Sequence, residues 1–372
     1  MRVELLVLLV VLLSGCVGRP PETPTTLEVA STTIAVTSMM EVLTTTSTTS
    51  ASSTTTILTI SDAIEDNCIG FLVGAPEDMG TIAVVGAGWA RPHPGPFAWG
   101  WIEKTRGEYD FSAVDEYVRR AQENNVAILA TVWPYADWDH EECHSVECDV
   151  SEGDIFYPRK KFSSVEGIPR KRCIPCDLDA YKVFVSKLVD RYDGDGVDDM
   201  PGLTLPIIYY EILNEPSMQE EDLTFFRGTP AEYVEIIRAS YEAVKGTCPE
   251  CRVVQAGASG IHDEPIRFWD DAFALGAGDY FDVANIHFIG SGDLSTLNVG
   301  DFKKLMGKHS IDKPVWVTEA EFRGIGEVDG AVTGALNAGA ERIFFTGFGA
   351  GHEPLQKPGQ FAQLYKTQRD KC

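Results

Sequence analysis

The chain has 372 residues, of which 44% are apolar and 10% aromatic, and this composition excludes a wholly disordered protein. Asp and Glu number 56 against 31 Lys and Arg, giving a net charge of −25. Proteins that bind nucleic acid need a basic surface, so this charge argues against a nucleic-acid partner. Nine cysteines are too few for a small disulfide scaffold, and the number is odd for a fully paired secreted protein.

The first residues of the chain are typical of an export signal. Arg2 precedes an apolar run over 5–13, which is too short to span a bilayer but suits a signal peptide. The run ends in Leu13-Ser14-Gly15-Cys16, which resembles a lipobox. We therefore expect 1–15 to be a lipoprotein signal peptide and Cys16 to be lipidated, which would leave eight cysteines. The alternative is an ordinary signal peptide with an incidental cysteine.

Residues 16–61 have the composition of a linker. About half of 17–61 is Ser or Thr, and 44–56 is Ser or Thr at every position except Ala51. Such a segment cannot bury a core, so we predict an extended spacer that holds an exported domain on the outer face of the cell membrane. Because 1–61 contains only two arginines and four glutamates, most of the acidity belongs to residues 62–372.

Residues 62–372 alternate short apolar runs with amphipathic segments. One helical face contains Phe111, Val114 and Val118, and a last helix is predicted over 355–369. Eight strand–helix pairs predict one α/β domain, a (β/α)8 TIM barrel. An open doubly wound sheet is the alternative, but its Gly-rich turn should open a helix, whereas Gly86-Ala87-Gly88 precedes a strand. The predicted strands cover 69–75, 89–93, 126–133, 206–213, 252–258, 283–288, 315–318 and 342–346.

Reactive side chains follow two of these strands, at the barrel end where TIM-barrel enzymes place their active sites. Strand four runs into Asn214-Glu215-Pro216, and strand seven ends in Thr318-Glu319. Carboxylates at the ends of apolar strands are costly to desolvate unless a site uses them. Hydrolysis of a glycosidic bond requires such a pair, one acid to protonate the leaving oxygen and one carboxylate to attack or to activate water.

Over nearly all of residues 69–350 the sequence resembles the clan A glycoside hydrolases of cellulase-like and xylosidase-like type. Asn214-Glu215-Pro216 matches the acid/base motif of these enzymes, and the Val-Thr-Glu of 317–319 matches their nucleophile strand. Arg91 resembles the arginine that positions the nucleophile, and His287 resembles the site histidine on strand six. Further matches lie between strand two and the following helix, at Trp101-Ile102-Glu103, Gly107, Tyr109-Asp110-Phe111 and Asp115.

The resemblance implies a retaining β-glycosidase that acts on a polysaccharide or oligosaccharide without a catalytic cofactor. Glu215 would be the general acid/base, Glu319 the nucleophile, and Asn214 a donor to the sugar 2-hydroxyl. The sequence departs from the family at two positions. Phe288 replaces the tyrosine that often follows the strand-six histidine, and Phe348 stands near the place of a tryptophan that forms the floor of the sugar site.

Other side chains compete for roles in this site. Glu211 shares a strand face with Glu215, and Glu321 shares one with Glu319; we expect an interior hydrogen-bonded group and a rim residue, respectively. Trp133 and Trp89 are candidates to stack on sugar rings, Trp133 more strongly because it ends strand three. A non-catalytic carbohydrate-binding lipoprotein would keep such aromatics without needing both glutamates, and a structural surface protein would need neither.

The remaining cysteines allow two kinds of cross-link. The long segment 139–176 contains two histidines and four cysteines and could form a zinc site, although two disulfides suit an exported protein better. A local disulfide is predicted between Cys248 and Cys251. Since the first strand and the last helix are neighbours in a closed barrel, Cys68 should pair with Cys372. The four cysteines of the long segment are Cys143, Cys148, Cys173 and Cys176.

The segment 193–199, Asp-Gly-Asp-Gly-Val-Asp-Asp, resembles a calcium-binding loop. Close carboxylates favour a hard cation, and the glycines permit a tight turn. Asp193, Asp195 and Asp199 are therefore candidate ligands of a structural calcium ion. A plain acidic turn is the alternative, because the bidentate glutamate of an EF-hand is absent from this loop.

Overall fold

Eight parallel strands form one sheet in the computed structural model, which describes residues 58–150, 168–219, 224–346 and 358–372. Neighbouring strands follow the order β5-β4-β3-β2-β1-β8-β7-β6. Isolated parallel bridges join Val254 to Val283 and Ala258 to Ile286, so β5 also meets β6 and the sheet nearly closes into a barrel. The strands are β1 Ile69–Leu72, β2 Trp89–Arg91, β3 Ala127–Val132, β4 Tyr209–Ile212, β5 Arg252–Gln255, β6 Ala284–Ile289, β7 Val315–Glu321 and β8 Ala340–Phe345.

Helices lie between consecutive strands, and the predicted (β/α)8 barrel is confirmed. The helix predicted over 355–369 corresponds to α12, Pro358–Arg369, and residues 355–357 lie outside the described ranges. None of the helices in the described residues is long and apolar enough to cross a membrane. The helices are α1 Asp62–Glu65, α2 Met79–Val84, α3 Trp99–Ile102, α4 Ser112–Glu123, α5 Asp137–Cys143, α6 Leu178–Asp190, α7 Pro230–Thr247, α8 Asp263–Ala274, α9 Val299–Lys308, α10 Val328–Asn337 and α12 Pro358–Arg369.

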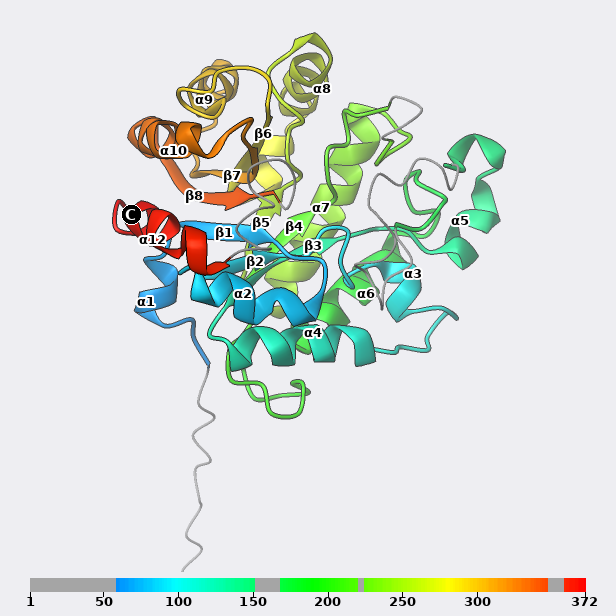
Figure 1. The fold of residues 1–372 in the computed structure, drawn as a ribbon. Helices are drawn as coiled ribbons and strands as arrows, with labels where there is room; N and C mark the ends of the chain where they lie inside the picture. Colours follow the sequence, from blue (N-terminus) through cyan, green and yellow to red (C-terminus); the bar gives the residue numbers. More distant parts are fainter. Residues whose placement is uncertain (1–57, 151–167, 220–223, 347–357) are drawn as a thin grey trace, which may run out of the picture. The chain divides into compact units, whose positions relative to one another are not determined.

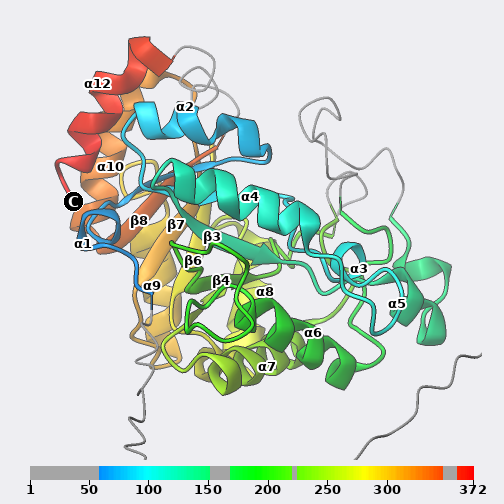
Figure 2. The same cartoon turned by 90° about the horizontal axis from the view of Figure 1, so that it is seen from below.

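The longer helices begin at recognisable caps and cover the outside of the barrel. Asp177 accepts a hydrogen bond from the Ala180 N–H at the start of α6, and Thr229 and Glu232 form a capping box at the start of α7. Helix α4 lies against β3, α7 against β4 and β5, and α10 against β8 (Figures 1 and 2). The apolar faces of these helices and the outer faces of the strands form the main core.

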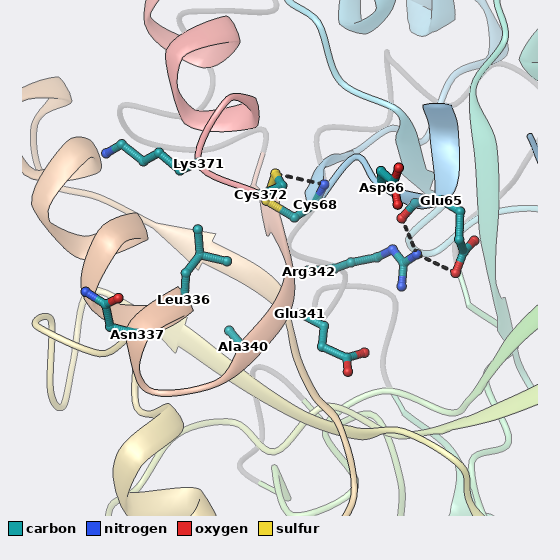
Figure 3. A pocket seen from close by; sticks show the side chains of 10 residues that line it. All are labelled: Glu65, Asp66, Cys68, Leu336, Asn337, Ala340, Glu341, Arg342, Lys371 and Cys372. Carbon is teal, nitrogen blue, oxygen red and sulfur yellow. Dashed lines mark hydrogen bonds and ion pairs between the residues drawn. A yellow bond between two sulfur atoms is a disulfide. The ribbon is translucent and has the colours of Figure 1, made fainter. Parts of the chain in front are cut away.

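The N-terminal end of the barrel is closed by a second apolar cluster. Ile60 and Ile64, at the start of the described chain, pack there with Trp89, Leu129 and Trp316. At the edge of this end lies a pocket of about 750 Å³ next to the Cys68–Cys372 pair, where Arg342 reaches across to Glu65 (Figure 3). The ends of α1 and α10, the start of β8 and the residues after α12 line this pocket, so it lies away from the strand ends that bear Glu215 and Glu319.

The eight cysteines of the described chain form four disulfides. Cys68 pairs with Cys372, which joins the start of β1 to the end of the chain after α12, and Cys248 pairs with Cys251. The pairing that the sequence left open joins the two outer and the two inner cysteines of the long segment, Cys143 with Cys176 and Cys148 with Cys173.

The structure favours disulfides over zinc in this segment. Thiols that are joined in a disulfide are not thiolate ligands for a metal. The ring nitrogens of His140 contact the backbone carbonyls of Ala136 and Cys173 at 3.0 and 2.8 Å, and Nε2 of His144 contacts the Ile174 carbonyl at 2.6 Å. Both histidines thus hold the segment through its backbone.

Several predictions fall on residues outside the described ranges. These are the signal peptide, the lipid site at Cys16, nearly all of the linker over 16–61, and Phe348. They and the boundaries between 15 and 16 and between 61 and 62 stay predictions.

Candidate active site

Five side chains predicted for the site come together at the C-terminal end of the barrel. Arg91 ends β2, Asn214 and Glu215 follow β4, His287 lies on β6 and Glu319 on β7. All five are nearly inaccessible to solvent, with exposed fractions of 3% for Glu215 and 6% for Glu319. Ionisable groups this deeply buried need specific partners, and the structure provides them.

Arg91 is the centre of the charge network. Its Nε and Nη2 donate to the two carboxylate oxygens of Glu211 at 2.5 and 3.0 Å. Its Nη1 donates to Oε1 of Glu319 at 2.7 Å, and Nη2 also donates to Oδ1 of Asn214 at 2.6 Å. One guanidinium therefore fixes the orientation of two carboxylates and an amide, as its planar fork of donors allows.

Glu211 is the interior hydrogen-bonded group expected from the sequence. Besides Arg91, it accepts hydrogen bonds from Thr131 Oγ1 at 2.8 Å and from Asn285 Nδ2 at 2.7 Å. Asn285 Nδ2 also lies 2.7 Å from Thr318 Oγ1. Glu211 thus holds Arg91 in place from within the barrel, and both of its carboxylate oxygens are used in hydrogen bonds to other buried side chains.

Glu215 has a different environment from Glu319. Its Oε1 lies 2.6 Å from Nδ1 of His287, whose Nε2 lies 2.9 Å from Thr318 Oγ1. No arginine or lysine of the described chain forms an ion pair with Glu215, whereas Glu319 is paired with Arg91. Three atoms of the site lie within 4.8 Å of one another: a carboxylate oxygen of Glu215, a carboxylate oxygen of Glu319 and a ring nitrogen of His287.

Electrostatics separate the two glutamates further. Burial raises the pKa of Glu215 to about 8; the nearby Glu211 carboxylate adds to this rise, and Arg91 opposes it. Burial lowers the pKa of His287 to about 4, so the imidazole is neutral beside Glu215 at neutral pH. Burial also raises the pKa of Glu319, against the opposing effects of His287 and the directly paired Arg91. Glu215 is therefore suited to hold a proton and Glu319 to be the carboxylate.

The backbone after β4 is bent to present these groups. Leu213 and Glu215 adopt positive φ values of +72° and +38°, which side-chain-bearing residues rarely adopt. Such strain concentrates at functional sites, where surrounding contacts maintain it. Leu213 N–H donates to the Val132 carbonyl at 2.9 Å, which ties this bend to the end of β3.

Two of the aromatic residues predicted to bind sugar do not face the site. Trp89 shares the inward face of β2 with Arg91 but lies one layer lower, in the cluster that closes the N-terminal end, and its Nε1 donates to the Ile64 carbonyl at 3.1 Å. That prediction was wrong. Trp133 lies near the strand ends, yet it has no exposed surface, and its Nε1 donates to the Pro94 carbonyl at 2.6 Å. In this structure it supports the loops around the site and offers no face to a ligand.

The other predicted groups lie as follows. Phe288 is buried and packs against Phe322, with ring centroids 6.4 Å apart. Glu321 is half-buried at the end of β7, as expected of a rim residue. Carboxylate oxygens of Asp193, Asp195 and Asp199 lie within 4.8 Å of one another, and burial raises the pKa of Asp193 to about 6. Structural calcium at these three residues stays a prediction.

Sequence reasoning did not identify the supporting residues Thr131, Asn285, Thr318 and Gly257. The first three could have been noticed as polar residues at inward positions of otherwise apolar strands. Gly257 follows β5, and a Cβ at this position would overlap the ring of His287. A glycine is therefore required for His287 to reach Glu215, although glycine alone in a sequence does not indicate this requirement.

The comparisons with known proteins identify the class of fold. No protein-family model matches this chain, and no curated protein matches it. Solved structures do match, and they share the (β/α)8 barrel fold. Their sequences are only 13–16% identical to this chain, so the likeness establishes the fold and not the activity.

Three structures illustrate the likeness. A glucosidase from Croceicoccus marinus is 16% identical, with a TM-score of 0.53 over 76% of this chain and 59% of its own. A GH39 enzyme from Xanthomonas axonopodis pv. citri is 13% identical, with a TM-score of 0.51 over 75% and 58%. An endo-1,4-beta-mannanase from Rhizomucor miehei is 13% identical, with a TM-score of 0.51 over 82% and 95%. The match thus spans about three fifths of the first two proteins and nearly all of the third.

Proposed function

We propose that the protein is a retaining glycoside hydrolase that cleaves O-glycosidic, β-linked bonds in a polysaccharide or oligosaccharide. The observation that supports this proposal is the pair of buried glutamates with contrasting environments. Their oxygens lie within 4.8 Å of each other, which suits direct attack better than the separation of about 6.5–9.5 Å that leaves room for a water in inverting enzymes.

Glu319 is the nucleophile in this mechanism. The Arg91 guanidinium, 2.7 Å away, stabilises its carboxylate and aims one oxygen while the other attacks the anomeric carbon. The attack expels the leaving group and forms a covalent glycosyl-enzyme. Water then releases the sugar by attacking the same carbon, so the configuration is retained.

Glu215 is the general acid and then the general base. With its pKa raised to about 8 by burial, it carries a proton at neutral pH and donates it to the departing oxygen. The resulting carboxylate takes a proton from the attacking water in the second step. Neutral His287 at 2.6 Å keeps the Glu215 carboxyl in place through both steps.

Asn214 is suited to bind the substrate. Its Oδ1 is fixed by Arg91, while Nδ2 is buried and has no hydrogen-bond partner within the described residues. A buried amide donor without a partner is costly, and a sugar hydroxyl would satisfy it. The proposal includes no cofactor for catalysis. It also includes export and attachment to the outer face of the membrane through Cys16, as the first 61 residues indicate.

The test uses a panel of aryl β-glycosides with the wild-type protein, Glu215→Ala and Glu319→Ala. Both variants should lose activity. Azide should rescue Glu319→Ala and give a glycosyl azide of inverted configuration, because the small anion attacks the anomeric carbon in place of Glu319, from the face opposite the leaving group. Glu321→Ala is the matched control, since this rim glutamate on the same strand should not be needed for attack. Full activity in Glu215→Ala or Glu319→Ala would overturn the proposed site.

A further inference from the structure

Thr318 precedes the proposed nucleophile in β7, yet its hydroxyl belongs to a chain of contacts that ends at the proposed acid. Its Oγ1 lies 2.9 Å from Nε2 of His287, and Nδ1 of the same ring lies 2.6 Å from Oε1 of Glu215. Thr318 and His287 have no exposed surface, and Glu215 is buried as well. The protons of this chain therefore have to be divided among these three side chains and their buried neighbours.

The hydroxyl hydrogen of Thr318 has an acceptor among these neighbours. Oδ1 of Asn285 lies 2.9 Å from Oγ1, and Oε1 of Glu211 lies 3.3 Å from it. The Asn285 amide is fixed at both ends: Nδ2 donates to Oε1 of Glu211 at 2.7 Å, and Oδ1 accepts from the Thr318 N–H at 3.2 Å. An ionised carboxylate only accepts hydrogen bonds and a backbone N–H only donates them. The amide therefore cannot be turned round, and Oδ1 stays available to the Thr318 hydroxyl.

Two arrangements of the protons satisfy this chain of contacts. A neutral imidazole has one donor and one acceptor nitrogen. If Thr318 donates to Asn285, its oxygen accepts from Nε2–H of His287, and Nδ1 then accepts the carboxyl proton of Glu215. If Thr318 donates to Nε2 instead, Nδ1 carries the hydrogen and faces an ionised Glu215.

The charges around the chain select the first arrangement. The groups whose charges act on Glu215 or His287 are Arg91 on β2, Glu211 on β4, Glu319 on β7, His93 after β2 and His262 after β5. The one arginine among them, Arg91, forms its ion pairs with Glu211 and Glu319. An ionised Glu215 would be a third buried carboxylate, and no lysine or arginine of the described chain is paired with it, which is costly. A protonated Glu215 that donates to Nδ1 avoids this cost.

We propose that Thr318 is a positioning residue for the acid: by accepting a hydrogen bond from Nε2, it fixes the tautomer of His287 whose Nδ1 accepts the proton of Glu215. Adjacent residues of β7 thereby serve both glutamates. Glu319 is the nucleophile itself, and Thr318 keeps the proton on Glu215 through His287. The effect on catalysis rests on the proposed glycosidase function, whereas the tautomer can be measured without it.

The first measurement is the tautomer, in the full chain labelled with ¹⁵N-histidine. The nitrogen shifts and two-bond couplings of each ring show which nitrogen carries the hydrogen, and His287→Gln identifies the His287 signals among the seven histidines. The wild type should show Nε2–H. Thr318→Val keeps the shape of the side chain but cannot accept a hydrogen bond, so its His287 should change to Nδ1–H. Thr318→Ser keeps the acceptor and should show Nε2–H.

The second measurement is the pH profile of kcat/KM for a β-linked disaccharide, whose leaving group needs the proton of the acid. In Thr318→Val the alkaline limb should move to lower pH by about one unit, the effect of one hydrogen bond, because Nδ1–H then stabilises the ionised form of Glu215. Thr318→Ser should restore the limb. Thr131→Val is the matched control, since this buried hydroxyl donates to Glu211 and has no hydrogen bond to His287 in the described chain. Its limb should stay where the wild type has it.

An Nδ1–H tautomer in the wild type would overturn the inference. So would an alkaline limb of Thr318→Val that stays in place or moves to higher pH, including the case in which the rate falls equally at every pH, since Thr318 would then only support the fold of the site. If Thr318→Val does not fold, the wild-type spectrum still decides between the two tautomers. Failure of the proposed function has a separate signature: the wild type would hydrolyse no glycoside, whatever tautomer its His287 shows.

Discussion

Two buried arginines at opposite ends of the barrel have contrasting surroundings. Arg91, at the C-terminal end, is held entirely by polar groups, namely the carboxylates of Glu211 and Glu319 and the amide of Asn214. Each of these partners also faces another polar group or the site. This arginine therefore orients Glu211 and Glu319, and it opposes the rise that burial gives the pKa of Glu215 and of Glu319.

Arg342, at the N-terminal end, is held mainly by aromatic rings. Its guanidinium carbon lies 4.3 Å from the ring centroid of Trp89, 4.5 Å from that of Trp316 and 5.3 Å from that of Tyr209. Its one ion pair in the described chain is with Glu65 at 2.7 Å, and that glutamate is partly exposed. Such cation–π contacts stabilise the barrel without preparing any group for chemistry.

Burial of charge therefore has two purposes in this fold. At the strand ends it gives two acids unequal electrostatic environments, which is costly for stability and suited to reaction. At the opposite end, the buried guanidinium of Arg342 packs among the aromatic rings that close the N-terminal end of the barrel. Three predictions test this division.

Arg91→Met should lower kcat/KM by about 10³-fold, because Glu319 loses the cation that orients it and that opposes the rise burial gives its pKa. The comparison is between initial rates of the variant and the wild type on an aryl β-glycoside, at a temperature where circular dichroism shows both to be folded. A loss of less than tenfold would mean that Arg91 does not prepare the nucleophile. Arg342→Met is the matched control for removing a buried arginine.

Arg342→Met should lower the free energy of unfolding by about 1–3 kcal/mol, because the three rings lose their cation. Glu65 is partly exposed and can be solvated again, which keeps the loss moderate. Urea denaturation of the variant and the wild type measures the change. The value of kcat/KM should stay within twofold; a loss comparable to that of Arg91→Met would contradict the separation of the two ends.

The alkaline limb of the pH profile should show the smallest effect. Since the pKa of Glu215 is raised to about 8, the acid carries its proton below this pH and loses it above. For substrates with poor leaving groups, kcat/KM should fall about tenfold for each pH unit above 8. A 2,4-dinitrophenyl glycoside needs no proton on its leaving group and should lack this limb. Identical profiles for both substrates would contradict the assignment of Glu215 as the acid.

Much of the fold and the centre of the site could be predicted from the sequence. The eight strands were recognisable because each is a short apolar run followed by a helical repeat, and closure of the barrel then placed Cys68 next to Cys372. Glu215 and Glu319 could be brought together without knowing any distance, because parallel strands present their C-terminal ends at the same end of a barrel.

Depth along a strand and contacts between loops could not be predicted in the same way. Trp89 and Arg91 share a strand face and are only two residues apart, yet Trp89 belongs to the core and Arg91 to the site. The alternation of side chains along a strand does not distinguish these two depths. The pairing of Cys143 with Cys176 depends on how a long loop folds back, which no periodic pattern encodes. The role of Gly257 depends on a ring contributed by a neighbouring strand.

The place where residue 58 joins the barrel determines which end of the barrel faces away from an N-terminal tether. Leu58 N–H donates to the Gly194 carbonyl at 2.8 Å, in the turn between α6 and β4, which lies at the end of the barrel opposite the glutamates. A tether joined ahead of residue 58, whether a lipid, a bead or a fusion partner, therefore attaches behind the catalytic opening. Immobilising the barrel through residue 58 should leave the strand ends that bear the glutamates accessible to an insoluble polymer.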